Sequence, residues 1–219
     1  GLSFGFPFPA GVVYDLGHIR LLDGDDELPA QFTATVFWPD GSLKWVLVAC
    51  TLPLKAGQTR ELTVECGNEV RHAAPPRGQE SVSVQEEPSR LIITTGGLRF
   101  TVNKERFNLL AEVWRDAKPG ARAASAQAIA TFDPWGGSLV DEHGKRFGMG
   151  IGKPDSVRLE MKGPGKVIVR AEGPYTAVDG ATYIRYIARL TFRSGSPVVE
   201  VAVTHIDDYV KTEFTDITS

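Results

Sequence analysis

The residues best suited to chemistry lie near the end of the chain, in the run from His205 to Tyr209. Removing the proton α to a uronate carboxylate takes a base, and a cation that neutralises the carboxylate. A side chain of this run could act as the base. Arg185 and Arg189, on another strand of the same predicted meander, could supply the cation. The run is also an ordinary polar strand end, which is the interpretation we favour. We therefore assign no catalytic residue, and Arg185 and His205 stand as candidate saccharide contacts.

Tryptophan side chains supply a second kind of chemistry, because an indole face stacks on the apolar face of a sugar ring. Trp135 lies in the segment Phe132–Gly137, which has no strand periodicity, so we expect an exposed ring that binds saccharide. The alternative is a plug that packs this loop onto the domain. Trp114 ends a predicted strand and is a further candidate. Trp38 and Trp45 alternate within predicted strands, and we expect both in a core.

Neither a metal site nor a cofactor site is predicted. The four histidines are far apart and lack the spacing of zinc motifs. The acidic run Asp23–Glu27 fails the EF-hand pattern because Leu28 stands where that loop needs glycine, so we predict a solvated turn. The run Gly148–Lys153 has the wrong spacing for a phosphate loop, and Pro154 prevents the helix that would follow one. An irregular bend is the better interpretation.

The two cysteines, Cys50 and Cys66, both fall in alternating apolar patterns. We expect each to be a small core hydrophobe. A disulfide between neighbouring strands is the alternative, and it would indicate an exported protein.

Composition agrees with a globular protein and weighs against some partners. The 219 residues are 42% hydrophobic, enough for one large core or two modest ones. A net charge of -3 and a pI near 5.9 argue against nucleic-acid and membrane-surface partners. The longest apolar run, Trp45–Cys50, is far shorter than the roughly 20 residues that cross a bilayer. Because the chain begins with Gly1, it reads as a processed product or an excised piece, and its ends give no localisation.

Apolar residues recur with a period of two almost everywhere, which predicts an all-β chain. Short polar turns between the strands favour an antiparallel sandwich or barrel. A polar, proline-containing stretch at 68–79 predicts a boundary between domains at 1–74 and 79–219. The Ala-rich stretch 116–126 holds the one plausible helix. Strands are predicted at 60–66, 90–95, 98–103, 107–115, 156–161, 166–171, 181–193 and 197–206.

A further hairpin is predicted around Trp38–Ser42, where Pro39, Asp40 and Gly41 suit a tight turn. A two-residue or four-residue loop pairs Trp38 with Leu43 and Val36 with Trp45, and places both indoles on one face. A three-residue loop pairs Val36 with Lys44 and separates the indoles. We favour the same-face register.

Five segments carry a family resemblance: FGFPFPAGVV (4–13), LPAQFTA (28–34), WPDGSLKW (38–45), GGLRFTV (96–102) and IARLTFRSGSPVVEVAVTHI (187–206). They resemble the rhamnogalacturonan exolyase-like family of bacterial and fungal proteins. The resemblance implies an N-terminal RIFT-type small β-barrel followed by an antiparallel β-sandwich. It also implies a C-terminal α/α toroid, and no stretch here looks like one.

The resemblance implies that this chain is the non-catalytic, β-rich N-terminal portion of a polysaccharide-degrading enzyme. It would scaffold or edge a carbohydrate cleft, with a polysaccharide or oligosaccharide as ligand and a C-terminal helical domain of the parent chain as partner. A secreted or periplasmic location follows from the same resemblance, and the chain alone is expected to lack lyase activity. The alternative is a self-standing carbohydrate-binding or interaction module without chemistry. Paired amphipathic helices after Ser219 would distinguish the two.

Overall fold

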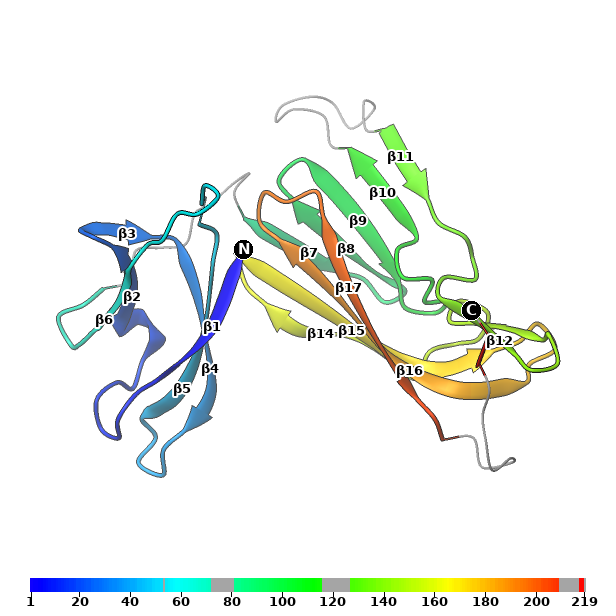
Figure 1. Cartoon of the computed structure of the whole chain (residues 1–219), viewed down its shortest axis with the longest axis horizontal. Helices are drawn as coiled ribbons and strands as arrows, with labels where there is room; N and C mark the ends of the chain where they lie inside the picture. The colour runs from blue at the N-terminus through cyan, green and yellow to red at the C-terminus, as the bar shows by residue number, and fades with distance from the viewer. Residues whose placement is uncertain (53, 72–80, 116–126, 209–216, 219) are drawn as a thin grey trace. The chain divides into compact units, whose positions relative to one another are not determined.

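In the computed structural model the chain is built almost entirely of β-strands (Figure 1). The one helical element among the described residues is η1 (Leu16–His18), a single 3₁₀ turn capped by the Asp15 carboxylate. No helix in the described part of the chain has the length and apolar character to cross a membrane. The all-β prediction is thus confirmed. The structure describes residues 1–52, 54–71, 81–115, 127–208 and 217–218.

The chain divides into two compact units. The first comprises Gly1–Ser81 with Gly163–Lys166, and the second comprises Val82–Lys162 with Val167–Ser219. The predicted boundary between residues 74 and 79 falls where the structure describes no residues, as does the predicted helix at 116–126.

The first unit consists of two three-stranded antiparallel sheets that share one core. Their orders are β1-β5-β4 and β3-β2-β6. The acidic run predicted as a turn joins β2 to β3, with Gly24 at φ +63°. The strands are β1 (Leu2–Pro7), β2 (Ile19–Asp23), β3 (Asp26–Leu28), β4 (Ala30–Phe37), β5 (Leu43–Cys50) and β6 (Leu62–Cys66).

Both cysteine side chains pack in the core of this unit, as predicted. Cys50 is buried, and Cys66 is partly buried against the same cluster. Both carry free thiols, so the alternative disulfide is not formed. Burial raises the pKa of the Cys50 thiol, which makes this group less reactive.

The hairpin between β4 and β5 closes with a three-residue loop. The Trp38 amide donates to the Ser42 carbonyl at 2.8 Å, and the Gly41 amide donates to the Trp38 carbonyl at 2.9 Å. Gly41 has φ +82°, the left-handed region that favours glycine. The Asp40 carboxylate accepts from the Ser42 amide at 2.9 Å and so fixes the turn from inside.

The register of this hairpin is only partly as predicted. Val36 does stand opposite Trp45, but Phe37, and not Trp38, stands opposite Leu43. The reason is that the loop contributes three residues, and an irregularity between the two pairs then restores the Val36 pairing.

The prediction that both hairpin tryptophans lie in the core is wrong. The irregularity brings Leu43 and Val46, which are 1% and 0% exposed, to the inner face and leaves Trp45 42% exposed. Trp38 is half-buried, with its indole N–H donating to the Phe8 carbonyl at 2.9 Å. The alternation of apolar residues does not reveal a bulge. The sequence-based prediction therefore placed these tryptophans on the wrong face.

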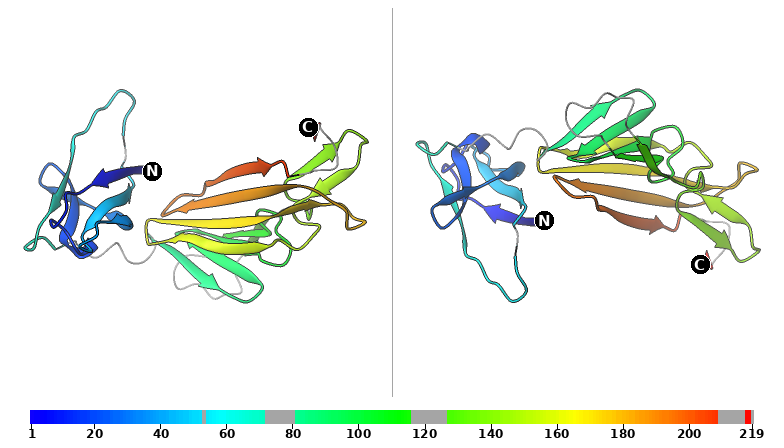
Figure 2. Two further views of the ribbon diagram at one scale, coloured as in Figure 1. Left: turned by 90° about the horizontal axis from the view of Figure 1, so that it is seen from below. Right: turned by 90° about the horizontal axis from the view of Figure 1, so that it is seen from above.

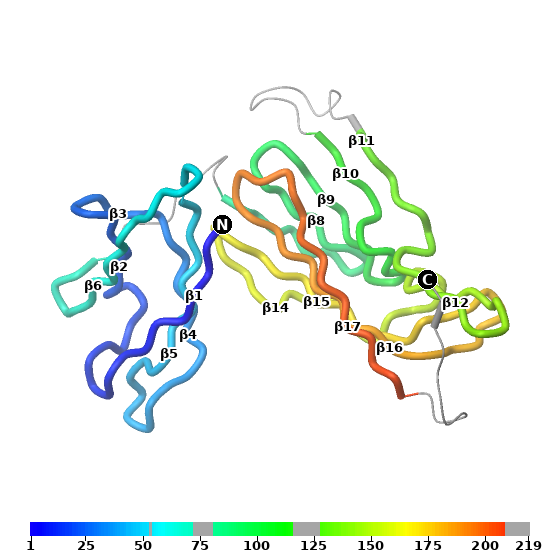
Figure 3. The backbone as a smooth tube through the Cα atoms, in the orientation of Figure 1, coloured from blue at the N-terminus to red at the C-terminus, as the bar shows by residue number. Residues whose placement is uncertain are grey.

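The second unit is a sandwich of two antiparallel sheets, whose layers are seen in Figures 2 and 3. The smaller sheet has the order β11-β10-β9-β8-β7, and the larger has β17-β16-β15-β13-β12-β18 with β14 paired to β15. The inner faces enclose one large apolar core. The strands are β7 (Val82–Glu86), β8 (Arg90–Thr95), β9 (Leu98–Asn103), β10 (Glu112–Arg115), β11 (Gln127–Thr131), β12 (Ser138–Asp141), β13 (Arg146–Gly148), β14 (Ser156–Lys162), β15 (Lys166–Thr176), β16 (Thr182–Arg193), β17 (Val199–Ile206) and β18 (Ile217–Thr218).

Most predicted strands are present, with β8 and β9 at the predicted bounds. The strand predicted at 107–115 is wrong in its first half, because β10 begins only at Glu112. Phe107 is fully buried from a loop, and Leu109 has φ +71°, which no strand residue adopts. The strands not predicted from the sequence are β1, β2, β3, β7, β11, β12, β13 and β18.

Replacing Gly41 with Val should lower the stability of the first unit by about 1 to 3 kcal/mol, because a β-branched residue resists positive φ. No atom lies within 4 Å of a Cβ built there, so backbone strain is the whole cost. Gly41→Asn is the matched control, since Asn tolerates this region better. Thermal melts of the two variants decide it, and equal melting temperatures would contradict the assigned turn.

Candidate functional site

Strand β17 leaves one side of the sandwich open. It is the edge strand of the larger sheet, and among the described residues it pairs only with β16. The inner-face residues of β16 are almost wholly buried, at 0% or 1% exposed: Tyr186, Ala188, Leu190 and Phe192. Their partners on β17 are not, since Val201 is 46% exposed and Val203 36% exposed. Only the start of β17 reaches the core, where Val199 packs against it, and in the described part of the chain Val201 and Val203 form an exposed apolar strip.

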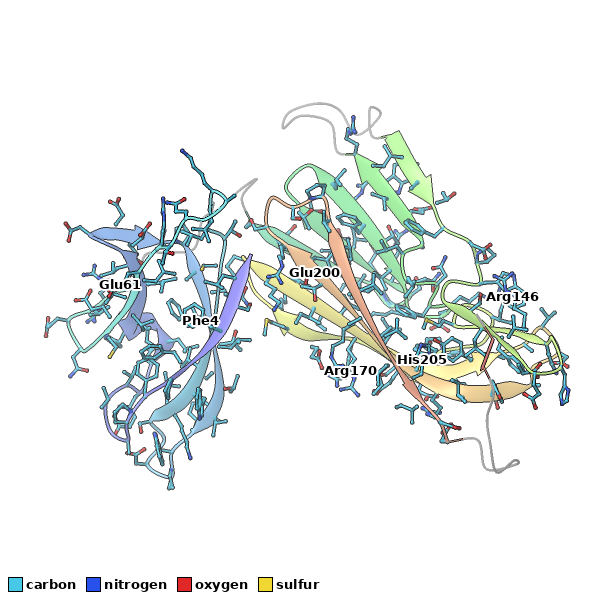
Figure 4. All side chains as sticks on the ribbon, viewed as in Figure 1. Phe4, Glu61, Arg146, Arg170, Glu200 and His205 are labelled. Atoms are coloured by element: carbon cyan, nitrogen blue, oxygen red, sulfur yellow. The ribbon has the colours of Figure 1, made fainter. Side chains whose placement is uncertain are left out.

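His205 lies at the C-terminal end of this strip (Figure 4) and is held by a buried tyrosine. Its ring stacks on Tyr175 with centroids 5.7 Å apart and an interplanar angle of 17°. His205 Nδ1 lies 3.3 Å from the Tyr175 hydroxyl. Burial raises the pKa of Tyr175 to about 12, so the hydroxyl keeps its proton. When that hydroxyl donates to Nδ1, the imidazole proton resides on Nε2.

The tyrosine behind His205 belongs to an aromatic column that runs into the core. Tyr175 contacts Tyr186 edge to face at 5.3 Å, and Tyr186 stacks on Phe107 at 6.0 Å. The Tyr186 hydroxyl is buried without a hydrogen-bond partner, and burial raises its pKa. The column fixes the orientation of His205 and places neutral donors and acceptors beside it, a chemistry suited to hydroxyl groups.

Arg185 lies on the opposite face from His205. Arg185 stands opposite Ile206, whereas His205 stands opposite Tyr186, and successive strand residues point to opposite faces. The guanidinium pairs with Asp155 and, at 3.7 Å, with Asp208, and Asp155 raises the pKa of Arg185. The structure thus brings Arg185 beside Asp208 of the run but separates it from His205, and Tyr209 lies outside the described residues.

The outer face of the larger sheet carries a network of ion pairs around Arg170 (Figure 4). Arg170 donates to Glu172 at 2.7 Å, and Arg189 donates to both oxygens of Glu160 at 2.7 and 3.0 Å. Arg170 lowers the pKa of Glu172, and Arg189 lowers the pKa of Glu160. Both carboxyls therefore stay ionised, the opposite of what a general acid needs.

A shallow hollow of about 580 Å³ lies near the other end of β17. The turn Gly195–Pro197 forms one side, anchored by the Thr95 hydroxyl that donates to the Ser196 carbonyl at 2.9 Å. Arg115 and Ile129 contribute from the smaller sheet, and Ile129 is 45% exposed. None of these residues was predicted to belong to a site, because they lie far apart in the sequence and carry no motif.

Trp135 is half-buried and packs against β13. The Arg146 guanidinium lies 4.3 Å from the centroid of the indole, and a Cβ added at Gly148 would come within 2.8 Å of the ring. The Trp135 amide donates to Asp133 at 2.7 Å, and its carbonyl accepts from Gly150 at 3.1 Å. This packing favours the plug alternative over an exposed platform, and a saccharide contact there remains a prediction.

The glycines of the Gly148–Lys153 run explain how that loop docks. A Cβ at Gly150 would lie 2.0 Å from the Pro134 carbonyl oxygen, and one at Gly152 would lie 2.4 Å from the Thr176 hydroxyl. Met149, directly before Gly150, is 1% exposed. The bend is irregular, as predicted, but it is tightly packed because only glycine permits these approaches.

Trp114 lies on the outer face of the smaller sheet, since its neighbour Val113 points into the core. Its indole N–H donates to Glu112 at 3.0 Å, and the Arg99 guanidinium lies 5.5 Å from the ring centroid. The four residues predicted as saccharide contacts therefore occupy separate places and form no common site. In the described part of the chain, no three His, Cys, Asp or Glu side chains cluster closely enough to hold a metal ion.

Two family models match the chain. The PcRGLX-like N-terminal RIFT barrel domain matches residues 1–67, and the PcRGLX-like protein central beta sandwich domain matches residues 82–215. The chain belongs to the PcRGLX-like family. This match confirms the resemblance to rhamnogalacturonan exolyase-like proteins and the fold class of RIFT barrel followed by sandwich.

One relative is the uncharacterized protein YetA of Bacillus subtilis (strain 168), which is 27% identical over 222 residues. The match covers 98% of this PcRGLX-like chain but 24% of YetA, so the chain spans about a quarter of that relative's length.

Replacing Trp135 with Ala should destabilise the sandwich unit by about 2 to 3 kcal/mol, somewhat less than truncating a fully buried indole. The contacts with Gly148 and Arg146 are lost together. Val178→Ala, at a side chain 77% exposed in the same unit, should leave the melting temperature unchanged. A Trp135→Ala protein as stable as the wild type would restore the exposed-platform interpretation.

Proposed function

We propose that this chain is the non-catalytic scaffold portion of a polysaccharide-degrading enzyme, and that the inner face of β17 forms one wall of its carbohydrate cleft. The family match supports the first part, because both matching models describe N-terminal and central domains of PcRGLX-like proteins. The uncovered face of β17 carries the second part. An apolar surface that continues the core of a domain is usually covered by a ligand or by another domain.

The composition of this face suits a saccharide. Val201 and Val203 offer apolar surface for the carbon face of a sugar ring, and His205 offers a fixed polar ring with which to bond hydroxyls. Arg115 at the hollow adds a positive charge near the start of the strand, which suits a uronate carboxylate. From Val199 to His205 the strand spans about 20 Å, enough for several sugar rings.

The wall needs an opposite side, and we assign that to a C-terminal helical domain of the parent chain. The relative YetA is about four times as long as this match, which leaves room for such a domain in that protein. A self-standing carbohydrate-binding module is the alternative. It would use the same face without the added domain, and a full-length sequence would separate the two.

Replacing His205 with Ala should weaken the binding of rhamnogalacturonan oligosaccharides about threefold to tenfold, the loss of one or two hydrogen bonds. Thr204→Ala is the matched control, because Thr204 is exposed on the same strand but points to the other face. Calorimetric titration of the 219-residue chain measures both. Equal affinities for the two variants would contradict the proposed wall.

The same samples also test the non-catalytic part of the proposal. Ultraviolet absorbance of an unsaturated product should stay flat with rhamnogalacturonan. A rising trace that His205→Ala abolishes would assign chemistry to this face.

A further inference from the structure

The outer face of the smaller sheet carries a row of side chains that crosses four strands. Ser83 stands opposite Thr94, Thr94 opposite Arg99, and Arg99 opposite Trp114. Directly opposite residues of an antiparallel sheet point to the same face. The row is therefore one continuous strip across β7, β8, β9 and β10. At a strand spacing of about 4.8 Å, its length is roughly 14 Å.

Trp114 at the end of this strip is held in one orientation. Glu112, two residues before it on the same face, accepts the indole N–H at 3.0 Å, and Arg99 lies beside the ring. The pairing of β10 with β11 shifts between Val113 and Trp114. Bulges of this kind turn side chains and are common beside binding sites. The indole is thus fixed at the strip's end and not folded into the core.

The neighbouring row repeats the polar character. Gln85 stands opposite Ile92, Ile92 opposite Thr101, and Thr101 opposite Glu112. Thr101 is 9% exposed and so is not accessible, and the remaining polar groups of the two rows are the hydroxyls of Ser83 and Thr94, the Gln85 amide, the Glu112 carboxylate and the Arg99 guanidinium, beside one indole. A membrane or an apolar partner would need a larger apolar patch than one indole and one isoleucine. A pyranose chain needs one stacking ring and many hydrogen-bonding groups in a line.

We infer that this strip is a second saccharide-binding surface, on the opposite side of the sandwich's smaller sheet from its core. It binds a short oligosaccharide along the row, with one ring on Trp114 and hydroxyls on Arg99 and Thr94. This inference deepens the proposed function and rests on it only in that both require a saccharide ligand. The two surfaces lie on different sheets, so an experiment can exclude saccharide binding at one of them and still show it at the other.

The test is a calorimetric titration of the 219-residue chain with rhamnogalacturonan oligosaccharides, read as the number of sites and the Kd of each. The wild type should show two sites. Trp114→Ala should weaken one of them about tenfold, and Trp114→Phe should retain most of that affinity because a ring remains. Trp45→Ala is the control, since Trp45 is an exposed indole of the other unit.

Two outcomes separate the two surfaces. A single site that responds to His205→Ala and not to Trp114→Ala overturns the inference and leaves the proposed wall intact. A single site that responds only to Trp114→Ala supports the inference and removes the wall. Should Trp114→Ala fail to fold, Thr94→Leu tests the middle of the strip, and unchanged binding by that variant overturns the inference.

Discussion

The packing of β16 against the smaller sheet is the interaction on which the second unit depends. Its inner face is buried from Tyr186 to Phe192, and the Phe192 ring meets Phe100 of the opposite sheet at 5.3 Å. Because this strand takes the centre of the contact, β17 beyond Val199 lies outside the core while still bonded to the sheet. The exposed face, the orientation of His205 and the hollow beside the β16–β17 turn all follow from that placement.

An exposed edge strand is also a hazard, because its free backbone groups can pair with another chain. The eight residues of β17 pair with β16 without a register shift, and the strand contains neither proline nor lysine. Its charged residue Glu200 is held by Arg193 at 3.1 and 3.2 Å and so does little to block the edge. An exposed edge strand without such protection is expected where a ligand or another domain covers it. This expectation agrees with the proposed cleft wall.

Much of the fold could be predicted from the sequence, because burial with a period of two is a local property. Strands β8 and β9 were predicted to the residue, and Cys50 was placed correctly in a core. The failures are where local pattern gives no information. The bulge that turns Trp45 outward, the left-handed Leu109 that shortens β10, and the glycines that seat Trp135 all depend on distant partners. The site was harder still, since Tyr175 and Arg115 carry no motif. The sequence could not show that Arg185 and His205 face opposite sides of one sheet.

The most direct measurement is hydrogen–deuterium exchange of the 219-residue chain with and without rhamnogalacturonan oligosaccharide. If β17 lines the cleft, the amides of Val199–Ile206 should exchange more slowly in the presence of the saccharide, because the ligand covers the free edge and inner face of the strand. Strand β5 of the first unit should serve as the unaffected reference. Unchanged exchange across β17 at a saccharide concentration that saturates binding would contradict the account.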